Sequence, residues 1–280
     1  MFAILLALNI LLPAKFDGTI GYAAIDLDTG QSVLMNADQS FPMGSIFKLP
    51  VALKTLQLVD QKKLDLSKSY TIKPEQFSPG FSPIRDKAHG KPVTMTLREL
   101  VRQTLEVSDN TAADNLMALI GGPKVVTDHL QTLGVNGIIV NRPEKQMIAD
   151  LHKPGGVAKF AIDPRDTSTP NGMLALLRLI HEKRDGLAAE SHEFVLRLML
   201  DTKTGPNRII SVLPPGATFA HKTGTMPGTT NDVGIITSPD KKHHIVIAVF
   251  VKGSSKETED AEKVVADIGR QVYAGMTTAR

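Results

Sequence analysis

The sequence predicts an α+β protein in which both chain ends build one antiparallel β-sheet with flanking helices, and an all-helical lobe is inserted between them. Three observations predict it. Residues 19–27 are apolar and β-branched, and strand-like segments return only after residue 216. The segments between them carry apolar residues at helical spacing. The chain of 280 residues, 42% of them hydrophobic and 22% charged, is long enough to bury a large core.

Local signals predict the elements in order. Asp28-Thr29-Gly30 is a turn between Thr19–Leu27 and Ser32–Leu34, which predicts a hairpin. Thr96-Leu97-Arg98-Glu99 has the form of a capping box, and Gly121-Gly122-Pro123 ends a later helix. We expect helices at 47–59, 96–107, 111–120, 172–184, 191–200 and 257–273, and further strands at 217–223, 233–237 and 244–251.

This order predicts two discontinuous domains. Residues 15–42 and 190–280 would form the α/β domain, and residues 43–189 the helical domain, with a cleft between them as a natural place for a site. The apolar run at residues 1–14 is shorter than the ~20 residues needed to cross a bilayer. It fits either the core of an export signal, although no Lys or Arg precedes it, or a buried first helix.

Composition excludes several functions. Lys and Arg exceed Asp and Glu by only 3 charges, and no basic run carries interleaved aromatics, so we expect no nucleic-acid partner. The absence of cysteine excludes disulfides and thiol chemistry. The eight histidines show no metal-ligand spacing, so we predict no metal. We also expect no cofactor, no stable membrane insertion and a monomer.

Ser45-Ile46-Phe47-Lys48 lies at the opening of the first long helix. A spacing of three places the hydroxyl and the amine on one helix face, and the helix N-terminus favours developing negative charge. A neighbouring amine can take the serine proton if burial lowers its pKa. The pattern alone is weak, because Ser238-Pro239-Asp240-Lys241 repeats it in a turn where no helix fixes the pair.

Two more short motifs follow. Ser108-Asp109-Asn110 lies between two predicted helices, where a helix cap for Thr111 onward is the plain structural interpretation. Lys222-Thr223-Gly224 lies in a predicted strand, and its glycine would let a ligand approach the sheet edge. Lys203-Thr204-Gly205 repeats this pattern just past a helix end, and we interpret it as a chance copy.

Taken together and in this order, the three motifs resemble those of serine β-lactamases and penicillin-binding proteins. The order and spacing are similar to class A β-lactamases over residues 16–275, which implies the β-lactamase/transpeptidase-like fold. Arg142-Pro143-Glu144 and Asp166 resemble the opening and the closing acid of the family's Ω-loop. Finer motifs are similar to the PER-type extended-spectrum branch: Phe41-Pro42-Met43, Asp114, Glu144-Lys145-Gln146-Met147 with Asp150, Thr204-Gly205-Pro206 with Arg208, and Ala220–Thr225.

The resemblance implies four catalytic residues. Ser45 would attack the lactam carbonyl and form an acyl-enzyme, and Lys48 would relay or accept its proton. Glu144 would activate the water that hydrolyses the ester, and Ser108 would pass a proton to the departing lactam nitrogen. Whether Lys48 or Glu144 is the acylation base stays open. The plain alternative for Glu144 is a solvated loop glutamate.

It also implies the substrate contacts. Asn110 would bond the amide side chain, and the backbone N–H groups of Ser45 and Thr225 would form the oxyanion hole. Phe81 would stand at the cleft rim, unless it is ordinary packing or Phe77 takes that place. The substrate carboxylate would be held by the segment around Gly224, through Lys222, Thr223 and Arg208. Arg208 could instead be a surface charge.

The sequence departs from the family at one important position. Ile148 stands where class A enzymes usually carry an Asn that helps hold the hydrolytic water, although the Glu-x-Gln-Met branch commonly lacks that Asn. The segment from Glu144 to Asp166 is also longer than the commonest Ω-loop. We hypothesise that this longer loop widens the cleft toward bulky cephalosporins. An unchanged preference between penicillins and cephalosporins after the loop is shortened would contradict this hypothesis.

The resemblance therefore predicts a β-lactamase that hydrolyses penicillins and cephalosporins. A penicillin-binding D,D-peptidase or transpeptidase, which would release the acyl group slowly, is one alternative. A non-hydrolytic β-lactam sensor is the other, although such a sensor is normally tethered to a membrane. A β-lactamase is useful where the drug meets the cell wall, so we expect a periplasmic or secreted protein.

Overall fold

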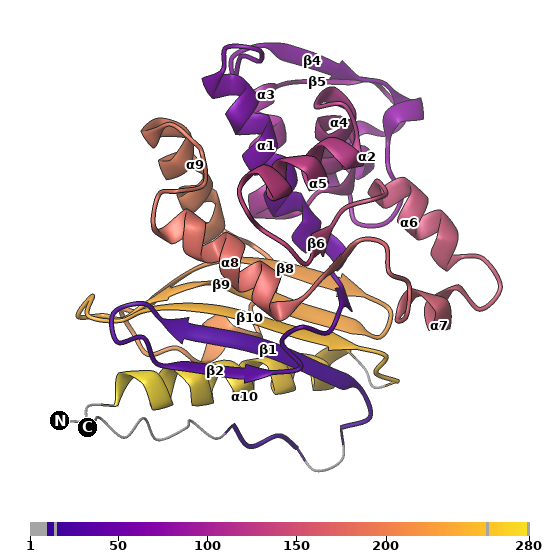
Figure 1. The fold of residues 1–280 in the computed structure, drawn as a ribbon. Coiled ribbons are helices and arrows are strands. Elements are labelled where there is room, and N and C mark those ends of the chain that lie inside the picture. The colour runs from indigo at the N-terminus through magenta and orange to yellow at the C-terminus, as the bar shows by residue number, and fades with distance from the viewer. Residues whose placement is uncertain (1–9, 14–15, 256–257, 279–280) are drawn as a thin grey trace.

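The computed structural model describes residues 10–13, 16–255 and 258–278, and its centre is a five-stranded antiparallel sheet (Figure 1). The strand order is β2-β1-β10-β9-β8. β1 (Thr19–Asp26) pairs along its whole length with β10 (His244–Lys252), from Thr19 opposite Lys252 to Asp26 opposite Ile245. The remaining strands are β2 (Ser32–Met35), β8 (Thr218–Met226) and β9 (Thr229–Thr237). Both chain ends thus build one sheet, as predicted.

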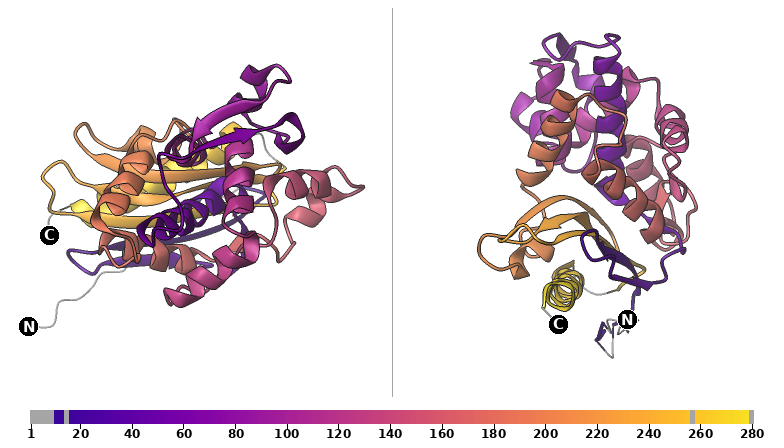
Figure 2. Two further views of the ribbon diagram at one scale, coloured as in Figure 1. Left: turned by 90° about the horizontal axis from the view of Figure 1, so that it is seen from above. Right: turned by 60° about the vertical axis from the view of Figure 1, so that its left-hand side comes forward.

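Strand β10 lies at the centre of the sheet and is buried on both faces. Ile245, Ile247, Val249 and Val251 pack into the core under helix α10 (Thr258–Thr277), and the alternate residues, such as Phe250, pack into the core on the opposite face. This alternation follows from the two-residue period of a strand. Figure 2 shows α10 on one side of the sheet and the other helices on the opposite side, where α8 (Pro170–His181) contacts β1 and β10.

The helical lobe surrounds α1 (Lys48–Asp60), which begins directly after the 3₁₀ turn Gly44–Phe47. α1 contacts α4 (Asn110–Leu119), α5 (Pro123–Thr132) and α9 (Ala189–Leu200). The remaining elements are β3 (Phe41–Pro42), β4 (Ser69–Ile72), the 3₁₀ turn Pro74–Gln76, α2 (Pro83–Ala88), β5 (Val93–Thr96), α3 (Leu97–Arg102), the π-helical turn Gln103–Val107, β6 (Ile138–Ile139), α6 (Glu144–Leu151), α7 (Gly156–Phe160), β7 (Thr167–Ser168) and the 3₁₀ turn Ile209–Val212.

One strand boundary and one helix cap differ from the prediction in ways that the structure explains. β9 begins at Thr229 rather than at residue 233, because its polar first residues are buried by neighbouring segments instead of by apolar packing. The predicted capping box is half formed. Thr96 Oγ1 accepts from the Glu99 backbone N–H at 3.2 Å, but the Glu99 carboxylate accepts from Arg102 and Gln103 instead of reaching back to the Thr96 backbone.

The N-terminal prediction concerns residues that lie mostly outside the described part of the chain. Residues 10–13 are described and form no helix; Ile10 is buried under the sheet, and Leu11 exchanges two hydrogen bonds with Gln271 of α10. Within the described ranges, no helix combines the length and apolar character that a bilayer crossing requires. The division into domains 15–42 with 190–280, and 43–189, stays a prediction.

A buried histidine in the lobe gives a testable pH dependence. His129 of α5 is 3% exposed, and burial, together with nearby Lys54, lowers its pKa from 6.5 to about 4. The unfolded state therefore binds more protons between these values, and the free energy of unfolding falls as the pH drops from 6.5 toward 4. Between pH 7 and pH 4.5, we expect the free energy of unfolding to fall by roughly 2 kcal/mol less in His129→Gln than in the wild type, as measured by urea unfolding. An identical pH dependence in both proteins would contradict this assignment.

Candidate active site

Ser45 lies in the 3₁₀ turn at the start of α1, and this turn is pressed against strand β8. A Cβ on Gly224 of β8 would lie 2.0 Å from the Met43 carbonyl oxygen, so only glycine allows this approach. Gly44 has a φ of +51°, and a Cβ there would lie 3.1 Å from the Thr225 backbone nitrogen. The backbone N–H groups of Ser45 and Thr225, which the resemblance assigns to an oxyanion hole, thus belong to two closely packed segments.

Lys48, the first residue of α1, contacts four other residues of the site. Its Nζ lies 3.0 Å from Ser45 Oγ, 3.2 Å from Glu144 Oε1 and 2.6 Å from Asn110 Oδ1, and it also donates to Ser108 O at 2.7 Å. Lys48 is fully buried and Glu144 is 1% exposed. Burial of a charge is costly unless it is paired and hydrogen-bonded, and the two charges satisfy each other here. Glu144 is therefore not a solvated loop residue.

The Ser45 hydroxyl lies between these two buried charges. It donates to Glu144 Oε1 at 3.0 Å and accepts from Lys48 Nζ at 3.0 Å. Ser45 itself is only half-buried, so a ligand can reach its hydroxyl from solvent while both charged partners stay dry. This arrangement can withdraw the serine proton at the moment of attack.

Ser108-Asp109-Asn110 combines the structural and the functional interpretations. Asp109 is the N-cap of α4, and its Oδ1 accepts from the Ala112 backbone N–H at 2.9 Å. Ser108 takes the left-handed conformation with φ of 66°, which is unusual for a serine and is found at functional sites. This turn aims Ser108 and Asn110 at Lys48, while Asp109 points the other way.

Lys222 of β8 reaches the same serine from the opposite side. Its Nζ donates to Ser108 Oγ at 2.9 Å. Among the described residues, its only other hydrogen bond is to the Thr223 carbonyl at 3.1 Å. Burial, and then the charge of Lys48, lowers the pKa of Lys222 well below its usual value. An anion brought to this end of the site would therefore relieve an uncompensated buried cation.

Arg208 is not a surface charge, because it is 3% exposed. Its Nε pairs with Glu262 Oε1 of α10 at 3.0 Å, and Nη1 donates to Asn231 O at 2.8 Å. Nη2 donates to Thr225 Oγ1 at 2.6 Å. Arg208 thus stands behind Thr225, whose side chain is exposed at the end of β8.

Of the two candidate aromatic residues, Phe81 fits the solvent-exposed position. Phe81 is 57% exposed, and its backbone carbonyl accepts from the Asn110 backbone N–H at 3.0 Å. Phe77 instead packs against the core of the helical lobe. Ile148 is half-buried near Asn110; a Cβ on Gly80 would lie 2.8 Å from its Cδ1 and 2.9 Å from Asn110 Nδ2.

Glu144 is the first residue of α6, and Asp114 of α4 fixes its backbone. The Asp114 carboxylate accepts from the backbone N–H groups of Glu144 at 2.7 Å and Lys145 at 3.0 Å, and from the Ser78 hydroxyl at 2.6 Å. Burial raises the pKa of Asp114, against the lowering effect of these hydrogen bonds. The sequence indicates Asp114 only as part of a motif. No local sequence pattern predicts its contact with Glu144, which lies 30 positions away.

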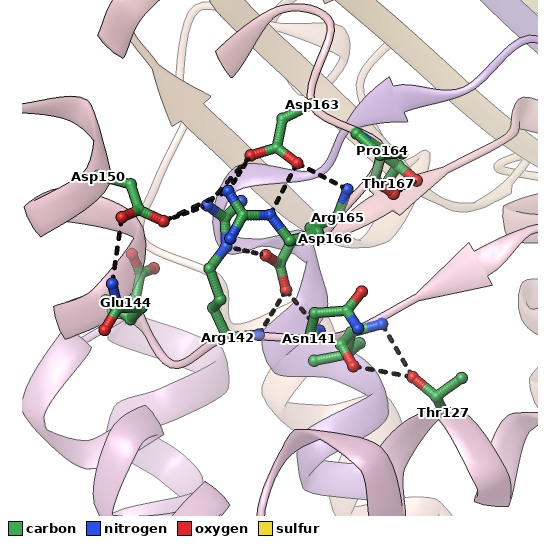
Figure 3. A network of polar contacts seen from close by, with 12 residues as sticks. Thr127, Asn141, Arg142, Glu144, Asp150, Asp163, Pro164, Arg165, Asp166 and Thr167 are labelled. Atoms are coloured by element: carbon green, nitrogen blue, oxygen red, sulfur yellow. Dashed lines mark hydrogen bonds and ion pairs between the residues drawn. The ribbon is translucent and has the colours of Figure 1, made fainter. Parts of the chain in front are cut away.

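Arg142 joins the two ends of the segment that follows Glu144. Figure 3 shows this side chain among three carboxylates: Arg142 bonds Asp166 at 2.6 Å, Asp150 at 2.7 Å and Asp163 at 3.1 Å. The Asp166 backbone carbonyl also accepts from Met43 N at 3.0 Å. The two ends of the loop are therefore joined to each other and to the turn that carries Ser45.

Replacing Asp114 with Asn should displace Glu144. Only one amide oxygen would remain to accept two backbone N–H groups, so one buried donor is left facing an NH₂ group. We expect a loss of about 1–3 kcal/mol in the free energy of unfolding and slower hydrolysis of the acyl-enzyme, measured by urea unfolding and by steady-state turnover. Asn115→Ala, which removes bonds to the Gln76 and Thr111 carbonyls and one from the Gln76 side chain, is the neighbouring control. Equal effects of both variants would contradict a role for Asp114 in placing Glu144.

Comparison with known proteins places this site in context. Residues 6–276 match the model of the beta-lactamase enzyme family. A beta-lactamase of Bacteroides uniformis is 33% identical over 266 residues, covering 92% of this chain and 86% of that protein. The extended-spectrum beta-lactamase PER-1 of Pseudomonas aeruginosa is 31% identical over 262 residues, covering 91% and 82% respectively. The solved structure of a beta-lactamase from Chitinophaga pinensis superposes with a TM-score of 0.85 at 34% identity, covering 94% of this chain and 96% of that one.

The fold is that of class A β-lactamases, which are among the solved structures that share it. The chain belongs to the beta-lactamase enzyme family and is a hydrolase that acts on β-lactams. The resemblance inferred from the sequence motifs is thereby confirmed, including the similarity to the PER-type branch.

Proposed function

We propose that the enzyme hydrolyses the β-lactam amide of penicillins and cephalosporins through an acyl-enzyme on Ser45, which water activated by Glu144 then releases. The observation that carries this proposal is the Ser45 hydroxyl held 3.0 Å from both Lys48 Nζ and Glu144 Oε1. A serine hydroxyl is a weak nucleophile unless a base stands beside it. Two candidate bases stand beside this one.

In acylation, Ser45 Oγ attacks the carbonyl carbon, and its proton passes to one of the two groups 3.0 Å away, Lys48 or Glu144. The developing oxyanion is stabilised by the backbone N–H groups of Ser45 and Thr225, where loss of one donor typically costs ~3 kcal/mol. The ring C–N bond then breaks, and the nitrogen takes a proton from Ser108. Both lysines lie within hydrogen-bond distance of Ser108 Oγ as donors, at 3.3 and 2.9 Å, which leaves the Ser108 proton free for this transfer. Ser108 in turn recovers the proton that left Ser45, delivered by Lys48 Nζ, which lies 3.3 Å from Ser108 Oγ and 3.2 Å from Glu144 Oε1, so that Glu144 is a carboxylate again before deacylation.

In deacylation, Glu144 takes a proton from a water molecule whose oxygen attacks the ester carbonyl. The ester C–O bond breaks and Ser45 Oγ recovers its proton. Ile148 offers no hydrogen bond to this water, so Glu144 is its main anchor. The rigid hold of Asp114 on the Glu144 backbone supports this role.

The substrate's anionic end would lie along β8. Lys222 is fully buried and bonds only Ser108 Oγ and the Thr223 carbonyl among the described residues, so a carboxylate would supply the ion-pair partner that this group lacks. We propose that Lys222 and Thr223 contact this carboxylate and that Arg208 acts on it through Thr225, which it holds at 2.6 Å. Asn110 would bond the amide side chain, beside the exposed ring of Phe81.

A time course with a chromogenic cephalosporin in large excess over enzyme tests the proposal. We expect linear turnover far beyond one equivalent. A burst of one equivalent followed by a plateau would contradict hydrolysis and favour a penicillin-binding or sensor protein. Absence of any signal would contradict acylation by Ser45.

We further propose that the protein acts outside the cytoplasm, in the periplasm or the medium, where β-lactams reach the cell wall. It would act as a monomer, because all the residues assigned to the site come from one chain. Cell fractionation and size-exclusion chromatography test these statements. Activity confined to the cytoplasm, or a dimer that loses activity on dilution, would contradict them.

A further inference from the structure

The second Lys-Thr-Gly copy, Lys203-Thr204-Gly205, lies directly beside the first. It forms the loop after α9, and Thr204 Oγ1 is 2.6 Å from Thr223 Oγ1. This is the only hydrogen bond given for either hydroxyl among the described residues. The motif that sequence context set aside as a chance repeat therefore touches a residue of the proposed carboxylate site.

Gly205 makes this contact possible. Its φ is +67°, and a Cβ there would lie 2.7 Å from Thr223 Cγ2 and 3.1 Å from Arg208 Cδ. A larger residue would push the loop away from β8 and break the contact between the two threonines. The glycine of the second copy thus allows the loop backbone to pack closely against the side chains of Thr223 and Arg208.

The loop is also fixed by the two residues that precede Thr204. Lys203 N donates to the Glu106 carbonyl at 2.9 Å, in the turn that leads to Ser108. Thr202 Oγ1 donates to the His221 carbonyl of β8 at 2.7 Å. Thr204 consequently faces Thr223 from a rigid support.

The proton count gives this contact a direction once an anion is bound. A hydroxyl has one proton to donate and can accept two. If Thr223 donates to a carboxylate, its oxygen can only accept from Thr204, so Thr204 must be the donor of the pair. The two hydroxyls then form a chain in which each bond polarises the next.

We propose that Thr204 is a positioning residue for the substrate carboxylate: its hydroxyl donates to Thr223 Oγ1 and thereby directs the Thr223 proton at the anion. This inference rests on the proposed function. In this proposal, Thr204 contributes to recognition of the substrate carboxylate and takes no part in the chemistry at Ser45.

The test compares a chromogenic cephalosporin with its C4 methyl ester, which lacks the anion. We expect Thr204→Val to lower kcat/KM for the acid roughly fivefold, about 1 kcal/mol, through a higher KM. The value for the ester should be unchanged, and Thr204→Ser should restore the wild-type value for the acid. Thr202→Val, which removes a hydroxyl of the same loop from the same strand, should affect acid and ester equally.

Three results would overturn the inference: no change in Thr204→Val, an equal loss with acid and ester, or no rescue by serine. An equal loss would mean that the hydroxyl only supports the loop. Failure of the wild-type protein to turn over the acid would instead refute the proposed function, and this inference with it. Urea unfolding of each variant ensures that folded proteins are compared.

Discussion

Replacing Glu144 with Gln is expected to turn the enzyme into a protein that is acylated once and then stalls. The amide keeps the size of the carboxylate but cannot take a proton from water. General-base catalysis contributes about 10²–10⁴ in rate, and we expect a loss of about 10³ in kcat. Lys48 Nζ, 3.0 Å from Ser45 Oγ, remains in this variant as a base for acylation.

Stopped-flow measurement with a chromogenic cephalosporin should show a burst close to one equivalent, followed by slow turnover. The surface variant Glu182→Gln, which loses an ion pair with Arg178, is a control that should behave as wild type. Unchanged steady-state turnover of Glu144→Gln would show that another group activates the water. Absence of the burst would identify Glu144 as the acylation base as well.

Replacing Lys48 with Met is expected to abolish acylation and to destabilise the fold. Without the ammonium group, Glu144 becomes an unpaired buried charge, and Ser108 O and Asn110 Oδ1 lose their donor. Breaking a buried ion pair from one side costs about 3–5 kcal/mol, and we expect the free energy of unfolding at pH 7 to fall by that order.

Lys222→Met is the matched comparison, since both lysines are fully buried in one site. Lys222 forms no ion pair with any described residue, and burial, followed by repulsion from Lys48, lowers its pKa. We therefore expect this variant to keep or raise the free energy of unfolding while KM for an anionic substrate rises. Equal destabilisation by both substitutions, measured by urea unfolding, would contradict this assignment of charges.

The sequence motifs predicted the residues that meet at the site, because each motif carries its own local context. Ser45 and Lys48 share one turn and one helix, and Ser108 and Asn110 flank a helix cap that is visible in the sequence. The α+β architecture followed from the same periodicities. Apolar patterning located the central strand β10 to within one residue.

Residues that act across long sequence separations escaped prediction. Asn231 lies in a polar stretch without strand-like alternation, yet its buried side chain donates to the Pro42 and Met43 carbonyls and holds the turn before Ser45. Arg208 was assigned to the substrate, but its position is fixed by Glu262, 54 residues away. Thr204 stands in the sequence only within a branch-specific motif and a chance Lys-Thr-Gly copy, and only the folded chain brings it to Thr223. Such contacts depend on tertiary packing and leave no local pattern.

The central claim is that Ser45 forms an acyl-enzyme that Glu144 resolves. The most direct test is intact mass spectrometry of Glu144→Gln mixed with a cephalosporin, followed by peptide mapping. We predict one adduct per chain, located on the peptide that contains Ser45, and no adduct in the double variant with Ser45→Ala. An adduct on another residue, or none in a folded Glu144→Gln protein, would contradict the account.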